Sequence, residues 1–180
     1  MRPVFFANKL DRESAEYLCL FPASCKGFAV LHSVSTETIL DNVSRVPIVS
    51  LIRVMVVDDF AGWRQTIASI LHEMPELQVI SEVADGAEAV RIAEELKPDL
   101  VTLDVSLPNL NGIDAAIRIS ELAPETKILF VSQHDDPDII TAALNTGAPG
   151  YLRKINAKTE LLSAVAAILL GGHFLSTAVG

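Results

Sequence analysis

Two adjacent carboxylates end an apolar run about a third of the way along the chain. The stretch IRVMVVDDF, residues 52–60, places Asp58 and Asp59 directly after a mainly apolar segment. Neighbouring ionised carboxylates repel each other, and the end of an apolar strand solvates them poorly. The pair therefore predicts a ligand or a partner group that compensates its charge.

Three later apolar runs, each of strand length, are also followed by a polar side chain: Asp104 after residues 99–103, Ser132 after residues 127–131, and Lys154 after residues 149–152. If these runs are parallel strands of one sheet, the polar side chains all lie at its carboxyl edge. Open α/β sheets form their binding crevice at that edge. The pattern predicts that three carboxylates, a hydroxyl and an ammonium group meet in one cleft.

These residue types together indicate magnesium and phosphoryl chemistry. Clustered carboxylates raise one another's pKa, and a hard divalent cation relieves the repulsion. Magnesium prefers oxygen ligands and is usually held by one or two carboxylates together with phosphate oxygens. We expect Asp58 and Asp59 to hold Mg²⁺ beside Asp104, which becomes a candidate nucleophile. Lys154 and the hydroxyl of Ser132 are candidates to hold the phosphoryl oxygens.

The elements that position these residues follow a regular alternation. Short β-branched runs occupy residues 52–57, 77–83, 99–103, 127–131 and 149–152. Helical periodicity fills each gap, and alternating strands and helices predict a parallel sheet with helices on both faces. The strands are nearly all apolar, as expected for strands covered on both sides. The predicted fold class is therefore α/β, a doubly wound five-stranded parallel sheet.

Five apolar stripes mark the predicted helices: Ile67, Ile70, Leu71 and Met74; Ala89, Ala93 and Leu96; Ile113, Ala116, Ile117 and Ser120; Ile140, Ala143, Leu144 and Gly147; and Leu161, Leu162, Val165, Ile168 and Leu169. Local signals support two of the helix starts. Asp85 and Glu88 have the spacing of a capping box. Asp136-Pro137 is typical of an N-cap followed by proline at the first helical position.

Composition limits the function classes. The chain has 180 residues, of which 50% are hydrophobic, which is enough for one core and an appendage. The formal net charge of −9 lies in residues 52–180, since acidic and basic side chains balance in residues 1–51. An acidic domain repels phosphate backbones, so we expect no direct nucleic-acid binding. Cys19 and Cys25 are interpreted as free thiols of a cytoplasmic protein, and no membrane span is predicted.

Residues 1–50 lack the alternation, and the sequence assigns them no fold. One interpretation is a weakly ordered extension, or an artefact of start-site choice, because the regular pattern begins at Leu51 and bacterial initiation can use a leucine codon. The other is a real accessory element, and both stay open. The expected boundaries are an extension at 1–50, a domain at 51–175, and a C-terminal tail or linker start at 176–180.

Residues 51–175 resemble the receiver domain of two-component response regulators. The motifs that carry the resemblance are VVDDF, VTLDVSLPNLNG, ILFVSQHDD and GYLRK. The ending GGHFLSTAVG is similar to the end of receivers in LuxR-type, NarL/FixJ-like regulators, in which a helix-turn-helix domain usually follows. The resemblance implies a flavodoxin-like fold with strand order 2-1-3-4-5. Whether such an output domain is missing from this chain or never existed is left open.

The resemblance also implies roles for the acidic residues. Asp104 would be the phosphoacceptor. The Mg²⁺ ligands would be the carboxylates of Asp58, Asp59 and Asp104 together with the backbone carbonyl of Ser106. The side chain of Ser106 occupies a position that tunes dephosphorylation in the family.

Further roles are implied for the later motifs. Ser132 would hydrogen-bond the phosphoryl group, and Lys154 would form an ion pair with it. Tyr151 would be an aromatic switch that turns inward when Ser132 moves. The chain departs from the family at Gln133, where a small residue is usual, and His134 lies at a second position that tunes phosphoryl lifetime.

The function implied by the resemblance is a switch that accepts a phosphoryl group from a sensor histidine kinase and changes conformation to regulate an output. A homodimer could form on phosphorylation. The domain would contribute only to its own phosphorylation and dephosphorylation, without being a turnover enzyme.

Three alternatives were weighed against this function. A degenerate receiver that serves as a scaffold would not need the complete set of acids, hydroxyl and lysine. A Mg²⁺-dependent phosphatase of the haloacid dehalogenase type needs a second acid two residues after its nucleophile, where this chain has Ser106. A nucleotide-binding Rossmann module needs a glycine-rich motif after the first strand, which is not present there.

Overall fold

A computed structural model describes residues 51–176 of the chain. The expectations for residues 1–50, including both cysteines, and for most of the C-terminal tail lie outside the described residues. The strands are β1 (Ile52–Val57), β2 (Leu77–Val83), β3 (Leu100–Leu103), β4 (Lys127–Ser132), β5 (Gly150–Arg153) and β6 (Phe174–Leu175). The helices are α2 (Ala61–Leu71), α3 (Gly86–Leu96), α4 (Gly112–Leu122), α5 (Pro137–Leu144), the 3₁₀ helix η1 (Lys154–Asn156) and α6 (Ala157–Leu169).

The sheet is parallel and has the order β2-β1-β3-β4-β5-β6. This confirms the predicted order 2-1-3-4-5, but the predicted count of five strands is wrong by one. The sixth strand, Phe174–Leu175, pairs with β5. The N–H of Phe174 donates to the carbonyl of Pro149, and the N–H of Ser176 donates to the carbonyl of Tyr151. A strand of two residues is too short to produce a periodic signal.

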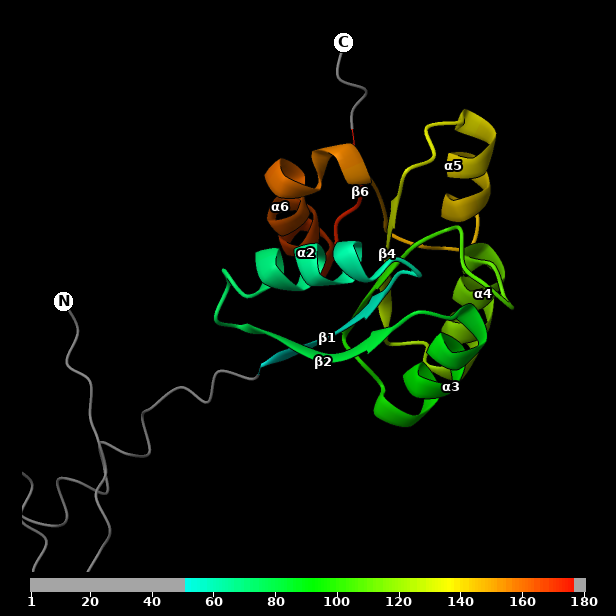
Figure 1. Cartoon of the computed structure of the whole chain (residues 1–180), viewed down its shortest axis with the longest axis horizontal. Helices are drawn as coiled ribbons and strands as arrows, with labels where there is room; N and C mark the ends of the chain where they lie inside the picture. Colours follow the sequence, from blue (N-terminus) through cyan, green and yellow to red (C-terminus); the bar gives the residue numbers. More distant parts are fainter. Residues whose placement is uncertain (1–50, 177–180) are drawn as a thin grey trace, which may run out of the picture. The chain divides into compact units, whose positions relative to one another are not determined.

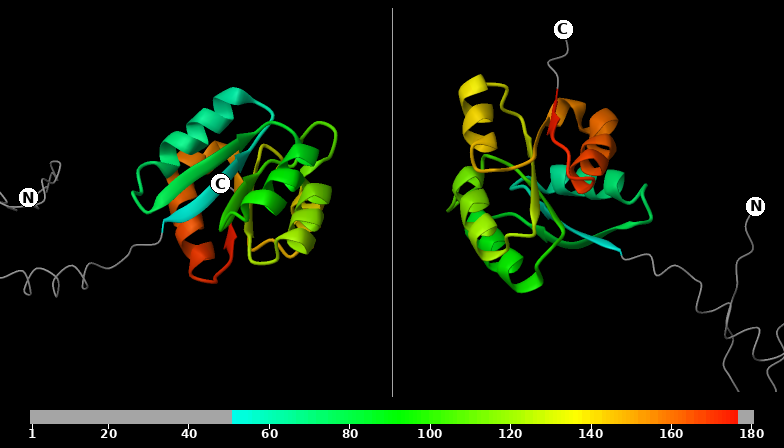
Figure 2. Two further views of the ribbon diagram at one scale, coloured as in Figure 1. Left: turned by 90° about the horizontal axis from the view of Figure 1, so that it is seen from below. Right: turned by 180° about the vertical axis from the view of Figure 1, so that it is seen from behind.

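Helices cover both faces of the sheet, as predicted. Helices α2 and α6 lie on one face, and α3, α4 and α5 lie on the other (Figures 1 and 2). Alternate residues of β1 enter the two halves of the core: Val54 and Val56 pack towards α2 and α6, whereas Met55 and Val57 pack towards α3, α4 and α5. All four are buried, which explains why the strand reads as continuously apolar.

The predicted acidic caps are present. The side chain of Asp85 accepts hydrogen bonds from the backbone N–H groups of Ala87 and Glu88 at the start of α3. At the start of α5, Asp136 accepts from the backbone N–H of Asp138, and proline occupies the first turn. These bonds satisfy donors that have no partner inside the helix.

Three predicted stripe positions are wrong: Ile117 lies off the buried face of α4, Met74 lies beyond the end of α2, and Gly147 lies beyond the end of α5 at Leu144. The buried face of α4 is Gly112, Ala115, Ala116 and Ile119, which is one residue earlier than predicted. Ile117, which was placed on the buried face, is 43% exposed. Small residues on the true face raise little hydrophobic signal, so the larger isoleucines dominated the pattern. Met74 also lies beyond α2, which ends at Leu71.

No helix within residues 51–176 is long and apolar enough to cross a membrane.

Candidate functional site

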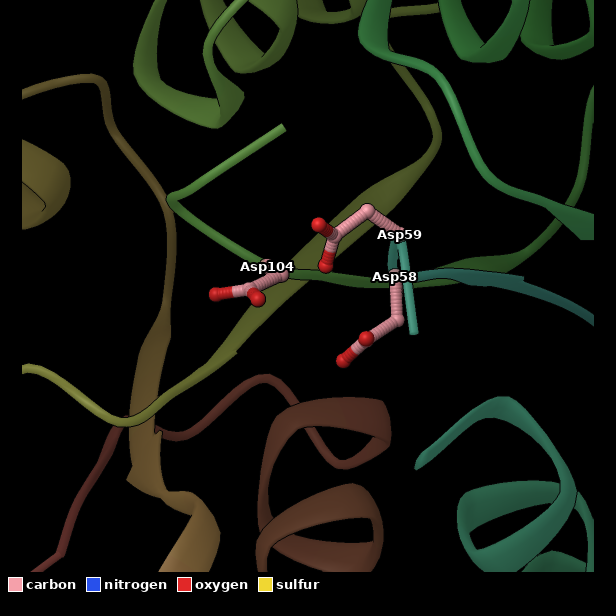
Figure 3. A group of neighbouring side chains, drawn as sticks. All are labelled: Asp58, Asp59 and Asp104. Carbon is pink, nitrogen blue, oxygen red and sulfur yellow. The ribbon is translucent and has the colours of Figure 1, made fainter. Parts of the chain in front are cut away.

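Three carboxylates meet at the carboxyl edge of the sheet. Asp58 and Asp59 directly follow β1, and Asp104 directly follows β3, the strand that pairs with β1. One oxygen from each carboxylate lies within 4.8 Å of the others, and Figure 3 shows the three side chains as one group. Asp58 and Asp104 are buried, whereas Asp59 is exposed. The expected proximity of the three acids is therefore present, and the exposed Asp59 marks the side open to solvent.

The ammonium group of Lys154 lies between two of these acids. Its Nζ is 2.5 Å from Oδ2 of Asp58 and 2.6 Å from Oδ2 of Asp104. The lysine is buried and begins η1, immediately after β5. With all groups ionised, three carboxylates and one ammonium leave a net charge of −2 in the cluster. That charge and the oxygen-only ligand set fit a hard divalent cation.

Burial makes the ionised form of Asp58 unfavourable. The carboxyl is inaccessible to solvent, and burial raises its pKa above the ordinary value of 3.8. The ion pair with Lys154 and a 3.0 Å hydrogen bond from the N–H of Phe60 lower the pKa, but they offset burial only in part. The charge of Asp104 raises it further. A cation bound here would favour the ionised carboxylate.

Arg64 fixes the backbone of the acid pair. Its Nη1 donates to the carbonyl of Asp58 at 2.7 Å and to the carbonyl of Asp59 at 3.2 Å. Because Arg64 lies in the first turn of α2, the helix start and the acid pair are tied together. Arg64 was not among the functional residues predicted from the sequence, although a basic side chain one turn after two acids was a signal that could have identified it.

The loop after β3 folds back closely on the start of α4. The N–H of Gly112 donates to the carbonyl of Val105 at 2.8 Å. A Cβ on Gly112 would lie 1.9 Å from the backbone oxygen of Asp104, so any larger residue would displace the loop that carries the acid. Ser106 lies in this loop, and its N–H is 3.4 Å from Oδ1 of Asp104.

A hydrogen bond joins the loops after β3 and β4. Oγ of Ser106 lies 2.8 Å from Nε2 of His134. Ser132, the buried last residue of β4, accepts a long hydrogen bond from the N–H of His134, at 3.5 Å. Gln133 is exposed. The structure therefore brings Ser106 and His134 together above Asp104.

Tyr151 is fully buried on β5. Its hydroxyl donates to the carbonyl of His134 at 3.0 Å, and its ring stacks on Phe130 with centroids 6.2 Å apart. Burial raises the pKa of the phenol above its ordinary value of 10.0. The tyrosine thus links β5 to the loop that carries Gln133 and His134.

Comparison with known proteins decides the family. The family model of the response regulator receiver domain matches residues 54–166. The chain belongs to the response regulator receiver domain family. The family match therefore excludes two of the alternatives, the Rossmann nucleotide-binding module and the haloacid dehalogenase phosphatase.

Several curated relatives of this receiver domain are named as transcriptional regulatory proteins or response regulators. The chain is 34% identical to the transcriptional regulatory protein DegU of Brevibacillus brevis over 124 residues, which are 69% of this chain and 52% of that protein. It is 33% identical to the transcriptional regulatory protein LiaR of Bacillus subtilis, covering 72% of this chain and 61% of LiaR. The chain thus spans about half the length of the curated relatives it matches.

Solved receiver structures share the fold. A LuxR-family two-component response regulator from Aurantimonas sp. SI85-9A1 is 34% identical, with a TM-score of 0.67 over 71% of this chain and 91% of that one. The signal receiver domain of the putative response regulator NarL from Mycobacterium tuberculosis is also 34% identical. Its TM-score is 0.63, over 68% of this chain and 98% of that one. These similarities confirm the LuxR-type, NarL-like receiver recognised in the sequence.

Proposed function

We propose that residues 51–175 act as a phosphorylation switch of a two-component system, with Asp104 as the phosphoacceptor and a sensor histidine kinase as the donor. The observation that carries the proposal is the position of Asp104. Its carboxylate lies in a buried acid cluster, and a buried ammonium 2.6 Å away holds one of its oxygens. Within residues 51–176, the only hydrogen-bond contact of the other oxygen is the long one with the N–H of Ser106.

Mg²⁺ is the proposed cofactor. The carboxylates of Asp58, Asp59 and Asp104, together with the backbone carbonyl of Ser106, would hold the ion. Their support is the oxygen-only ligand set and the net charge of −2 that Lys154 leaves uncompensated. When bound, the ion supplies charge neutralisation for the phosphoryl oxygens at the moment of transfer.

In the transfer step, a carboxylate oxygen of Asp104 forms a bond to phosphorus, and the phosphorus–nitrogen bond of the donor phosphohistidine breaks. The imidazole nitrogen keeps the electron pair and takes up a proton from solvent. Lys154 forms an ion pair with the phosphoryl group, and the hydroxyl of Ser132 donates a hydrogen bond to it. The product is an acyl phosphate on the chain itself, so the domain is no turnover enzyme.

The acyl phosphate would shift an equilibrium between two conformations. Ser132 and Tyr151 would carry the change towards α5, β5 and α6, where a homodimer could form. The hydrogen bond from the hydroxyl of Tyr151 to the carbonyl of His134 supports this coupling, because that carbonyl belongs to the loop that follows Ser132. Ser106, Gln133 and His134 would tune the lifetime of the phosphoryl group. The setting would be the cytoplasm, without direct contact to nucleic acid or membrane.

Labelling with a small phosphodonor tests the proposal. The purified chain, incubated with Mg²⁺ and acetyl phosphate, should gain about 80 Da, the mass of one phosphoryl group. Asp104→Asn should abolish the gain, and the exposed Asp138→Asn should keep it as a matched control. Intact-mass spectrometry at neutral pH measures both. Labelling that persists in Asp104→Asn would refute the assignment, and a wild-type chain that binds Mg²⁺ but is never labelled would indicate a scaffold receiver.

A further inference from the structure

A cavity of about 760 Å³ adjoins the acid cluster. It lies between the first turns of α2 and the segment that follows β5, and its walls include Phe60, Trp63, Lys154 and Ile155. Lys154 contributes to both places, since its ammonium also contacts Asp58 and Asp104. The lysine therefore stands at the boundary between the acids and a cavity whose walls combine aromatic and aliphatic side chains with the cationic Arg153 and Lys158.

The ring of Trp63 is a third partner of this ammonium. Nζ of Lys154 lies 5.6 Å from the ring centroid. Cations within about 6 Å of an indole face are attracted by its quadrupole, and the attraction is larger where water is excluded. Lys154 is only 3% exposed and Trp63 is half-buried, so water is partly excluded from the contact.

The first turn of α2 fixes the position of the Trp63 ring relative to the acid pair. The N–H of Trp63 donates to the carbonyl of Phe60 at 3.0 Å as α2 begins. The next residue, Arg64, bonds the carbonyls of Asp58 and Asp59. The distance between the indole and the acids is therefore set by backbone contacts within a few residues.

We propose that Trp63 is a positioning residue for phosphoryl acceptance and that it acts through Lys154. A divalent cation bound to Asp58 would weaken the 2.5 Å contact between that carboxylate and the ammonium, because the two positive charges compete for it. The indole face keeps the ammonium at the rim, within reach of Asp104, when the contact with Asp58 is given up. The inference rests on the proposed function, in which Lys154 contacts the phosphoryl group, and it assigns to Trp63 the role of positioning Lys154.

Fluorescence tests the contact without any phosphoryl transfer. Trp63 is the single tryptophan of the chain, so indole emission reports on it alone. Mg²⁺ should change the emission of the wild type as the ammonium moves against the ring. In Lys154→Met the change should be lost, while the Mg²⁺-dependent rise in melting temperature persists. An equal emission change in Lys154→Met would overturn the proposal.

Labelling rates test the consequence. With acetyl phosphate, Trp63→Leu should slow labelling about three- to tenfold, whereas Trp63→Phe should stay within about twofold of wild type because it keeps an aromatic face. Phe60→Leu is the control, since Phe60 lines the same cavity without a ring contact to Lys154. A leucine variant as fast as wild type, or a phenylalanine variant as slow as leucine, would overturn the proposal.

The two tests separate the possible failures. If the wild type is never labelled, the proposed function fails, and the fluorescence experiment still decides whether Trp63 senses the ammonium. The circular dichroism spectrum of Trp63→Leu could show that this variant does not fold. The test then uses the labelling rates of Trp63→Phe and Phe60→Leu and the Mg²⁺-dependent emission of Lys154→Met. In that case, loss of the Mg²⁺-dependent emission change in Lys154→Met supports the proposal and its retention overturns it.

Discussion

Asp58 is a buried carboxyl whose ionised form would be stabilised by a bound cation. The carboxyl is fully buried, and burial raises its pKa although Lys154 and the N–H of Phe60 both favour the ionised form. Near neutral pH, an ionised carboxylate at this position therefore costs the metal-free protein stability. A group that is unfavourable in the empty site and favourable with a cation couples metal binding to the stability of the fold.

Asp58→Asn should therefore stabilise the metal-free protein. We expect a melting temperature about 2–5 °C higher than wild type at pH 7 in the presence of EDTA, roughly the shift produced by 1 kcal/mol in a domain of this size. The amide keeps the shape of the side chain but carries no buried charge. Thermal denaturation followed by circular dichroism measures the difference.

The pH dependence of this difference has a defined sign. The pKa of Asp58 in the folded state is raised above 3.8. At pH values between 3.8 and that folded pKa, the folded state keeps a proton on Asp58 that the unfolded state has released. The wild type thus loses stability relative to Asp58→Asn as pH rises from 3.8 through the folded pKa, and the two should converge below that range. Added Mg²⁺ should raise the melting temperature of the wild type and not that of the variant. A variant less stable than wild type at pH 7 in EDTA would contradict this account.

Among the elements, the loops at the carboxyl edge are tied to the starts of the helices that follow them. Arg64 ties α2 to the acid pair, and the loop after β3 packs against Gly112 at the start of α4. The close approach of Gly112 to the backbone of Asp104 leaves no room for a Cβ. The position of Asp104 therefore depends on a residue eight positions later that carries no functional group.

Gly112→Ala should destabilise the protein by about 1–3 kcal/mol, because the added methyl group meets backbone that cannot move aside easily. It should also slow labelling of Asp104. Gly62→Ala is a matched control in a helix, since its Cβ would meet only the exposed ring of Phe60, which can turn away. That control should be neutral or stabilising by up to about 1 kcal/mol, the preference of helices for alanine. Urea denaturation compares them, and equal stabilities for the two variants would refute the argument.

The sequence predicted features that depend on regular repetition. The parallel sheet and the meeting of Asp58, Asp59 and Asp104 at its carboxyl edge followed from apolar strands that alternate with helices, whereas the strand order was implied by the resemblance to receiver domains. The stripe of α4 was misplaced because Ala115 and Gly112 carry little hydrophobic signal.

The features that were missed depend on side-chain direction or on very short pairing. The bonds of Arg64 to two carbonyls and the ring of Trp63 near Lys154 depend on how the first turn of α2 faces the sheet. For Trp63, no spacing in the sequence encodes that orientation, whereas the basic side chain one turn after the acid pair was a signal for Arg64. Strand β6, at two residues, leaves no period to detect.

At the scale of the molecule, the described residues contain a complete two-sided core. Both hydrophobic clusters draw their members from the strands and helices between residues 52 and 174, one cluster on each face of the sheet. The acid cluster lies between them at the carboxyl edge, and its three acids come from loops within this unit. Folding and phosphoryl acceptance should therefore need no contribution from residues 1–50.

Deleting residues 1–50 tests this division of the chain. The shortened protein should keep its melting temperature within about 3 °C, a shift that corresponds to roughly 1 kcal/mol or less in a domain of this size. Its labelling rate should equal that of the full chain. Calorimetry and intact-mass spectrometry make the two measurements. Loss of cooperative unfolding would show that the boundary at residue 51 is misplaced.

The two-residue strand β6 has a consequence for self-association. It covers the outer backbone of β5 at Gly150 and Tyr151, and Ser176 anchors it through hydrogen bonds with Asn156 and Glu160. Without it, β5 would present unpaired N–H and carbonyl groups, a template on which strands of other molecules can add. A segment too short to be recognised as a strand thus blocks the edge along which the sheet could otherwise grow into aggregates.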